Sequence, residues 1–158
     1  MAESIGKRIA QLRQRHGLTQ EALAARMAIS RVAISHIEMD LTIPGERTIT
    51  LMAGIFKLSP YDLVEGTTYP ITKAERLPLN TCCYTKLEMD IALFNNDLIW
   101  LDRLEKTPIE SIAESRLKSE IIENWITRLS DWDGEFLSEQ ELESLEKVRD
   151  ALKSIPDQ

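Results

Sequence analysis

The chain has 158 residues, of which 43% are hydrophobic and 28% charged, and it carries a formal net charge of −7. This composition is that of a globular protein with one domain or two small ones, and it excludes a disordered chain. No run approaches the ~18 apolar residues of a membrane-spanning helix, and the N-terminus lacks the apolar core of a signal peptide, so we expect no membrane association and a cytoplasmic protein.

The charge is divided unevenly along the chain. Residues 1–66 contain eight Lys and Arg against seven Asp and Glu, a net of +1, whereas residues 67–158 contain 11 against 19, a net of −8. The acidity therefore belongs to the C-terminal half, and the charge of the whole chain is a poor guide to the N-terminal surface.

Five short helices are predicted in residues 1–66, which makes this part a compact all-α domain. Ile5, Ile9 and Leu12 form an apolar face on a helix over 3–15, and Gly17 ends that helix. Each of the other four helices follows a residue that favours a helix start: 20–27 follows Thr19, 31–38 follows Ser30, 49–58 follows Thr48, and a helix at 60–63 follows Ser59, with Pro60 at its first position. The next stretch contains Gly66, Pro70 and Pro78, which interrupt helical periodicity, so we predict a linker over 67–80.

Three long helices are predicted in the acidic half, residues 81–158. The first carries an apolar seam with alternating steps of four and three: Leu87, Ile91, Phe94, Leu98 and Leu101. The second begins at the capping box Thr107–Glu110, and the third at the box formed by Ser138 and Glu141. Two arrangements remain open, because the seam suits a helical bundle within one chain and equally a homodimer.

Catalytic and metal-binding patterns are not found in the sequence. There is no phosphate-binding loop and no nucleophile with a neighbouring base, so we expect neither an enzyme nor a cofactor. His16 and His36 are too few for metal chemistry. Cys82 and Cys83 are adjacent, which disfavours a disulfide between them, and we interpret them as reduced thiols, with a thiol sensor or an intermolecular bridge as the alternatives.

The helices predicted at 20–27 and 31–38 have the features of a crossing pair. Ala24 is small enough for the second helix to pass over it, and Leu23, Ile34 and Ile37 are apolar where the pair faces the core. The remaining face of the second helix projects outward and carries Arg31, Val32, Ser35 and His36.

Residues 3–65 resemble the phage repressor and Cro type of helix-turn-helix family, often called XRE. The resemblance is carried by Thr19-Gln20-x-x-Leu23-Ala24, by Ser30, and by Ile34-Ser35-x-Ile37-Glu38. It implies binding of double-stranded DNA, with Arg31, Val32, Ser35 and His36 as base readers in the major groove. Gln20, with Thr19 and Arg15, is implied to contact phosphates, and Arg13 and Glu38 are implied to form an ion pair.

Several of these residues also have simpler interpretations. Arg31 and His36 could be solvated side chains without a base contact, and Arg15 with His16 could complement the dipole at the end of the first helix. Two positions depart from the family pattern. Ala28 replaces the glycine of the turn, where φ is positive, which implies strain of about 1 kcal/mol. Asp40 replaces the glycine after the second helix and puts an anion near the expected phosphate path.

These observations predict a sequence-specific transcriptional regulator, a repressor that acts as a homodimer through Leu87, Ile91, Phe94, Leu98 and Leu101. One alternative is an antitoxin or anti-repressor whose C-terminal helices bind a protein partner. Another is a small-molecule sensor with a pocket between the long helices.

Overall fold

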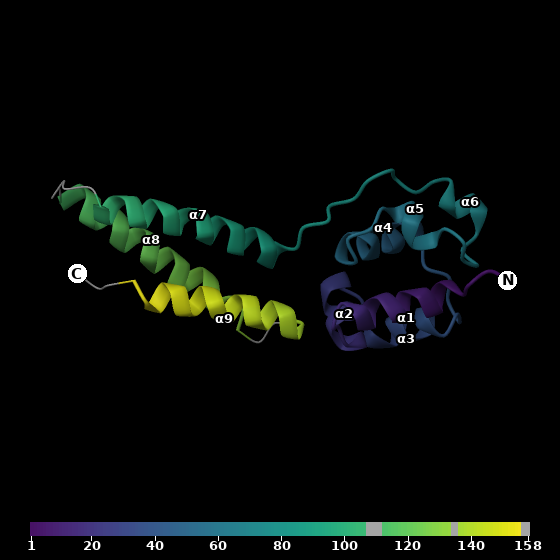
Figure 1. The fold of residues 1–158 in the computed structure, drawn as a ribbon. Helices are drawn as coiled ribbons and strands as arrows, with labels where there is room; N and C mark the ends of the chain where they lie inside the picture. The colour runs from purple at the N-terminus through teal and green to yellow at the C-terminus, as the bar shows by residue number, and fades with distance from the viewer. Residues whose placement is uncertain (107–111, 134–135, 156–158) are drawn as a thin grey trace. The chain divides into compact units, whose positions relative to one another are not determined.

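The computed structural model describes residues 1–106, 112–133 and 136–155. Its regular elements in these ranges are all helices, and the only β-type pairing among them is an isolated bridge between Glu3 and Thr67. The all-α prediction is therefore confirmed. The chain divides into two compact units, which we describe separately: Met1–Thr85 with Phe136–Ser138, and Lys86–Glu135 with Glu139–Gln158 (Figure 1).

The first unit contains the five predicted helices and one more. They are α1 (Ile5–Arg15), α2 (Gln20–Met27), α3 (Arg31–Glu38), α4 (Glu46–Ile55) and α5 (Pro60–Val64), followed by α6 (Ile71–Ala74). Helix α4 begins three residues before its predicted start, so Thr48 lies in its first turn, and the N-cap is Gly45, which makes no side-chain capping bond. The start of α5 agrees with the prediction, because Ser59 caps it and Pro60 is its first residue.

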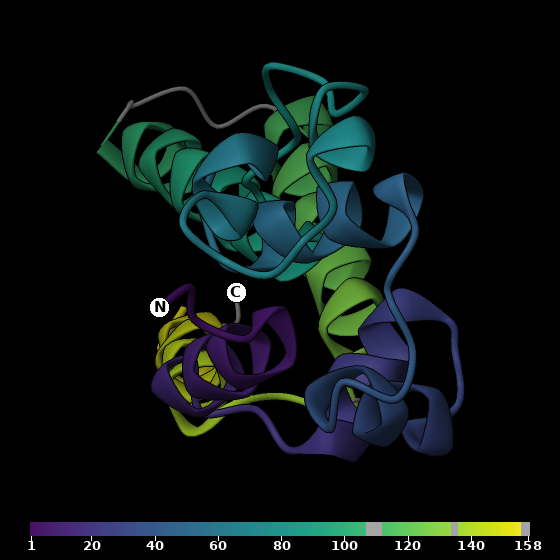
Figure 2. The ribbon, with the colours of Figure 1, turned by 90° about the vertical axis from the view of Figure 1, so that its right-hand side faces the viewer.

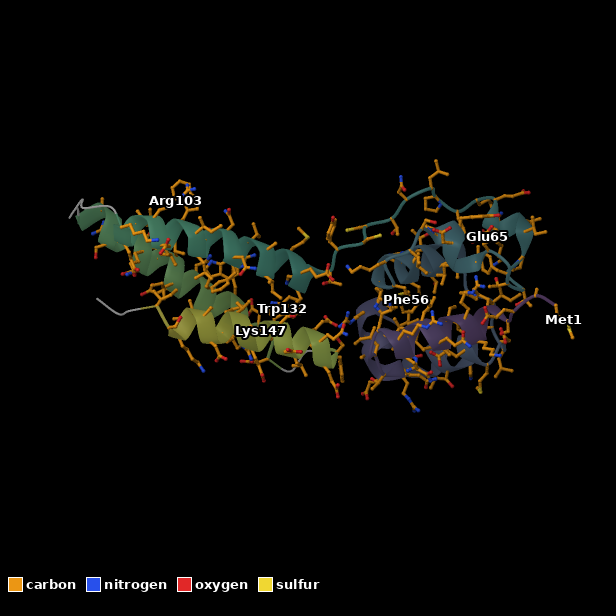
Figure 3. The ribbon with its side chains drawn as sticks, viewed as in Figure 1. Met1, Phe56, Glu65, Arg103, Trp132 and Lys147 are labelled. Atoms are coloured by element: carbon orange, nitrogen blue, oxygen red, sulfur yellow. The ribbon has the colours of Figure 1, made fainter. Side chains whose placement is uncertain are left out.

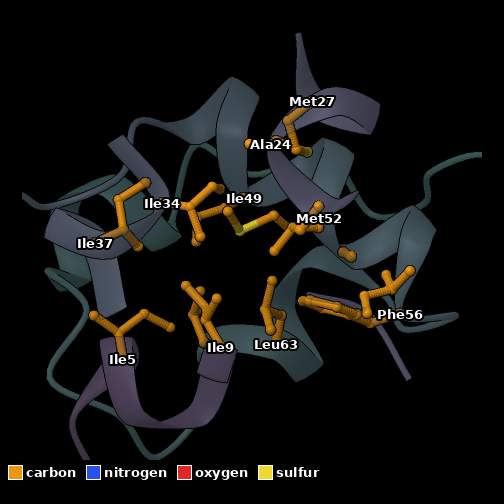
Figure 4. Packing of buried hydrophobic residues seen from close by; sticks show 14 of the residues in the cluster. Ile5, Ile9, Ala24, Met27, Ile34, Ile37, Ile49, Met52, Phe56 and Leu63 are labelled. Carbon is orange, nitrogen blue, oxygen red and sulfur yellow. The ribbon is translucent and has the colours of Figure 1, made fainter. Parts of the chain in front are cut away.

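The core of this unit takes side chains from each of the helices α1 to α5 (Figure 4). Six large apolar side chains in it are fully buried: Ile9, Leu23, Ile34, Ile49, Met52 and Leu63. They come from five short segments that could not bury an apolar face alone, so each helix depends on the others for its stability.

Helices α1 to α4 end in the same way. A residue with a left-handed backbone ends each of them, at Gly17, Ala28, Asp40 and Lys57, with φ between 53° and 66°. The next N–H then bonds to the carbonyl five residues earlier, as from Leu18 to Arg13 (3.1 Å) and from Leu41 to His36 (2.9 Å). Only the first of these four residues is a glycine, so three turns hold a side chain in a conformation that costs about 1 kcal/mol.

The stretch predicted as a linker, 67–80, contains α6 and a buried tyrosine. Tyr69 is part of the first unit's core, and burial raises the pKa of its phenol to about 12. The chain then runs along the outside of α4 (Figures 1 and 2). There Thr81 donates to the Thr50 carbonyl (3.1 Å), and a Cβ added at Gly54 would lie 2.3 Å from the Cys82 carbonyl oxygen. The boundaries 1–66, 67–80 and 81–158 remain predictions of domain organisation.

The second unit packs three long helices: α7 (Lys86–Lys106), α8 (Ile112–Ser130) and α9 (Glu139–Lys153). The predicted three long helices are confirmed, and the predicted capping residue of the third, Ser138, directly precedes Glu139, the first residue of α9. The capping box at 107–110 lies outside the described residues. Phe94 of α7 meets Trp125 of α8 edge to face at 5.2 Å, and both side chains are buried together with Leu145 of α9.

Buried polar contacts between α7 and α8 fix how these two helices align. The Asp90 carboxylate accepts hydrogen bonds from Arg128 Nη2 (2.7 Å) and from Trp132 Nε1 (3.0 Å), just beyond the end of α8. Farther along α7, Asp97 accepts from Trp125 Nε1 (2.7 Å). A shift of α8 along α7 would break these bonds. It would leave buried carboxylates without hydrogen-bond donors, which is energetically costly. None of the helices in the described ranges combines the length and the apolarity that crossing a membrane requires.

Candidate nucleic-acid interface

Helices α2 and α3 form a closely crossed pair with a capped start on each helix. The Thr19 hydroxyl accepts the Ala22 N–H (3.0 Å) and starts α2, and the Ser30 hydroxyl accepts the Ala33 N–H (3.1 Å) and starts α3. These bonds confirm both predicted N-caps. Ala24 is buried at the crossing, as its size predicts.

The turn between the two helices holds an alanine in a left-handed conformation. Ala28 has φ 53° and ψ 39°, which confirms the positive φ that the sequence predicts for this position. Its N–H bonds to the Ala25 carbonyl (3.2 Å), and the following N–H reaches the Ala24 carbonyl (3.1 Å). The backbone hydrogen bonds that close this turn are therefore present, and its conformational strain comes from the Cβ of Ala28 alone.

We expect Ala28→Gly to stabilise the protein by about 1 kcal/mol, because glycine adopts positive φ without the clash of a Cβ. Urea unfolding followed by circular dichroism measures the change. Ala25→Gly is the matched control: Ala25 is an exposed helical residue of α2, where glycine should cost about 1 kcal/mol. Equal losses from both substitutions would show that Ala28 carries no strain.

One face of α3 is exposed and the opposite face is buried. Arg31, Val32 and His36 are exposed and Ser35 is half-buried, while Ile34 and Ile37 lie in the core. All four predicted base readers thus lie outside the buried stripe of α3. Val32 has 59% of its surface exposed, so its methyl groups are accessible on the outer side of α3.

A buried network ties the end of α3 to α1 and α2. Arg13 Nε donates to Glu38 Oε1 (2.6 Å) and Arg13 Nη2 to Glu38 Oε2 (3.1 Å), which is a bidentate ion pair. Arg13 Nη1 also donates to the Leu18 carbonyl (2.8 Å), and Gln20 Nε2 donates to Glu38 Oε2 (2.8 Å). The side chains of Arg13 and Glu38 are only 12% and 7% exposed, so the pair is largely removed from solvent.

A second contact joins Asp40, two residues after the end of α3, to the first turn of α1. The Asp40 carboxylate accepts the Gly6 N–H (3.0 Å) and the hydroxyl proton of Ser4, the N-cap of α1. Asp40 therefore stabilises the positive end of the α1 dipole. The charge of Asp40 therefore stabilises the domain itself. This role accounts for an acidic residue at a position where the family pattern has glycine.

The same contact depends on Gly6, which the sequence analysis did not single out. A Cβ at Gly6 would lie 2.4 Å from the Ile37 carbonyl oxygen and 2.7 Å from that of Glu38. No side chain fits there, because both neighbouring atoms belong to the backbone of α3. The sequence did hold a sign of this approach, since a glycine inside an otherwise regular helical pattern calls for a packing reason.

The predicted phosphate contacts lie around the N-terminus of α2 and the end of α1. Thr19 is exposed, Gln20 is half-buried with its amide on Glu38, and Arg15 is exposed. His16 is half-buried and its ring packs on Phe56 at 5.5 Å. The N-terminus of α2 thus exposes the capping residue, whereas the imidazole next to Arg15 is used in packing.

The residues predicted for dimerisation are partly used inside one chain. Leu87, Phe94 and Leu101 are buried in the second unit, while Ile91 and Leu98 are half-buried. The seam of α7 thus contributes to the core with α8 and α9, which was the alternative left open by its spacing. Whether the protein dimerises stays a prediction.

No group of three or more potential metal-ligating side chains occurs among the described residues. Both cysteines are free thiols, Cys82 exposed and Cys83 half-buried.

A capped, closely crossed helix pair with an exposed second helix is the architecture of a helix-turn-helix DNA-binding module. Residues 9–63 match the family model described as helix-turn-helix. This part of the chain is a helix-turn-helix domain of the XRE type, as the resemblance implied, and such domains bind DNA and typically belong to regulators rather than enzymes. Comparison with curated proteins finds no match for the chain.

Proposed function

We propose that this protein is a sequence-specific transcriptional repressor, located in the cytoplasm, that binds DNA as a homodimer. The observation that carries the proposal is the outer face of α3, where Arg31, Val32 and His36 are exposed on a helix whose other face is in the core. A rigid helix with such a face can enter the major groove and present side chains to base edges.

The chemistry of these side chains suits base recognition. An arginine can donate two hydrogen bonds to guanine O6 and N7, and a valine can contact the methyl group of thymine. The Gln20 amide has two N–H groups, and its bond to Glu38 takes one, which leaves the other for a phosphate oxygen. Gln20 and Thr19 would then hold the domain in register, while α3 reads the sequence.

A homodimer is proposed because one domain of this size covers little DNA. A single module buries roughly 600–1,000 Å² of protein surface on DNA, and helix-turn-helix proteins commonly bind two half-sites about one turn apart, ~34 Å. The acidic second unit repels the phosphate backbone, which favours contact through the first unit alone.

The test is selection of binding sites from genomic fragments with the full chain, followed by fluorescence anisotropy on the selected sites. We expect specific sites to bind at least ~10³-fold more tightly than random DNA at physiological salt. Arg31→Ala should lower the ratio between specific and random DNA by about tenfold or more, because base contacts discriminate. Gln20→Ala should weaken both by a similar factor, because phosphate contacts carry no sequence information.

Arg116→Ala is the matched control, since Arg116 is exposed on α8 and should leave both affinities unchanged. The repressor role is tested separately with a reporter behind the selected site. Equal affinity for all fragments, or a reporter that the protein activates, would contradict the proposal.

A further inference from the structure

Helix α7 has a second apolar stripe on the side away from its seam. Met89, Leu93 and Trp100 are exposed by 55%, 48% and 53%, although all three are large apolar residues. Their spacing places them on one side of the helix, together with Asn96 and Arg103. The Arg103 guanidinium lies over the Trp100 ring at 5.5 Å, and Figure 3 shows Arg103 pointing away from α8.

This side of α7 is also free of charge over three turns. The exposed residues between Met89 and Trp100 are Met89, Ala92, Leu93, Asn95, Asn96, Ile99 and Trp100. The two carboxylates in the same stretch, Asp90 and Asp97, are bonded to side chains of the second unit. Residues 86–158 as a whole hold 18 acidic and nine basic residues, so an uncharged face is an exception here. Depletion of charge together with exposed aromatic and methionine side chains is typical of the centre of a protein interface.

We propose that this stripe, Met89, Leu93, Asn96 and Trp100, is the surface through which two copies of the chain form the dimer. The inference rests on the proposed homodimer and names its contact surface. A second copy fits better than a basic or acidic partner, because the face offers neither charge to attract one. Between two chains of net charge −7, the contact with least repulsion is also the one through an uncharged face.

The position of Asn96 supports a symmetric contact. In an antiparallel pair whose two-fold axis passes at Asn96, the Asn96 residues of the two copies meet, and Met89 of each copy lies opposite Arg103 of the other at the rim of the contact. The two amides can then bond to each other, which satisfies a polar group that the interface buries. A single asparagine in an apolar helix contact sets the register of the pair. The seam of Leu87, Phe94 and Leu101 stays in the core of each copy.

Light scattering and analytical ultracentrifugation of the full chain at micromolar concentration test the surface. We expect a mass of about twice 18.0 kDa for the wild type, and the monomer mass for both Leu93→Glu and Trp100→Glu, because each would bury charge in the contact. Ile126→Glu is the matched control: Ile126 is 57% exposed on α8, outside the stripe, and this variant should stay dimeric. Circular dichroism verifies that each variant is folded.

Crosslinking gives a second measurement that does not depend on the charged variants. In a chain with Cys82→Ser and Cys83→Ser, oxidation of Asn96→Cys should yield a disulfide-linked dimer, and Ile126→Cys should not, since a disulfide needs Cα atoms within about 7 Å. A dimer that survives both glutamate substitutions, or an Asn96→Cys chain that remains uncrosslinked, overturns the proposed surface. A monomeric wild type overturns the homodimer as well, whereas the DNA-binding test is unaffected by either outcome.

Discussion

Gly6→Ala is expected to destabilise the first unit by 3 kcal/mol or more, on the order of the largest effects of single substitutions. The added Cβ would lie 2.4 Å from the Ile37 carbonyl oxygen, 2.7 Å from the Glu38 carbonyl oxygen and 2.8 Å from Asp40 Oδ1. Relief of these contacts requires α1 to move away from α3. Such a movement would also break the bond from Gly6 to Asp40 and open the core around Ile9.

The control is Gly45→Ala, which adds the same atom at a site with no neighbour within 4 Å and no positive φ. It should cost no more than about 1 kcal/mol, because alanine is a poorer N-cap residue than glycine. All three tryptophans lie in the second unit. Tryptophan fluorescence therefore follows that unit, while circular dichroism in urea follows all helices. Similar losses for Gly6→Ala and Gly45→Ala would contradict the close approach.

Glu38→Gln is expected to cost about 3 kcal/mol of stability. The substitution keeps the shape of the side chain but removes the charge that accepts bonds from Arg13 and Gln20, so a largely buried guanidinium loses its counter-ion. Removal of one partner of a buried ion pair typically costs about 3–5 kcal/mol. Urea unfolding at neutral pH measures the loss.

Glu21→Gln is the matched control, because Glu21 is exposed on α2 and its replacement should change stability by no more than about 0.5 kcal/mol. A double variant, Arg13→Met with Glu38→Leu, removes both charges at once. It should lose less stability than Glu38→Gln, because no buried charge is left without a partner. A double variant that is far less stable than the single one would mean that the pair stabilises the domain outright.

Much of the fold could be predicted from local patterns. The caps Thr19, Ser30 and Ser59 mark helix starts through a bond to an N–H three residues on, and that bond needs no information from the rest of the chain. The turn at Ala28 was predicted by the resemblance, and its backbone agrees. Helix α4 was predicted too late, because Gly45 makes no side-chain cap that a pattern could reveal.

The features that escaped prediction are contacts between residues far apart in the sequence. Gly6 meets α3 through atoms more than 30 residues away, and Asp40 accepts bonds from the start of α1. Neither contact partner can be recognised from the sequence alone, so Gly6 was not singled out and Asp40 was interpreted only as an anion near the expected phosphate path. In α7 the seam was recognised, but its spacing left open whether α8 and α9 or a second copy would cover it. The uncharged opposite face was not predicted, because recognising it requires the exposed fraction of each side chain.

Two contacts join α1 to α3, and they affect how the protein responds to a wrong base pair in its site. Asp40, two residues after the end of α3, bonds to the first turn of α1, and Arg13 of α1 bonds to Glu38, the last residue of α3. Fraying of α3 from this end would therefore break contacts of α1 as well, and amides of the two helices should exchange hydrogen with similar free energies. In the proposed complex, the recognition helix then adapts little to a mismatched site. The energetic cost of the mismatch falls on the DNA, whose sequence-dependent stiffness becomes part of the selection.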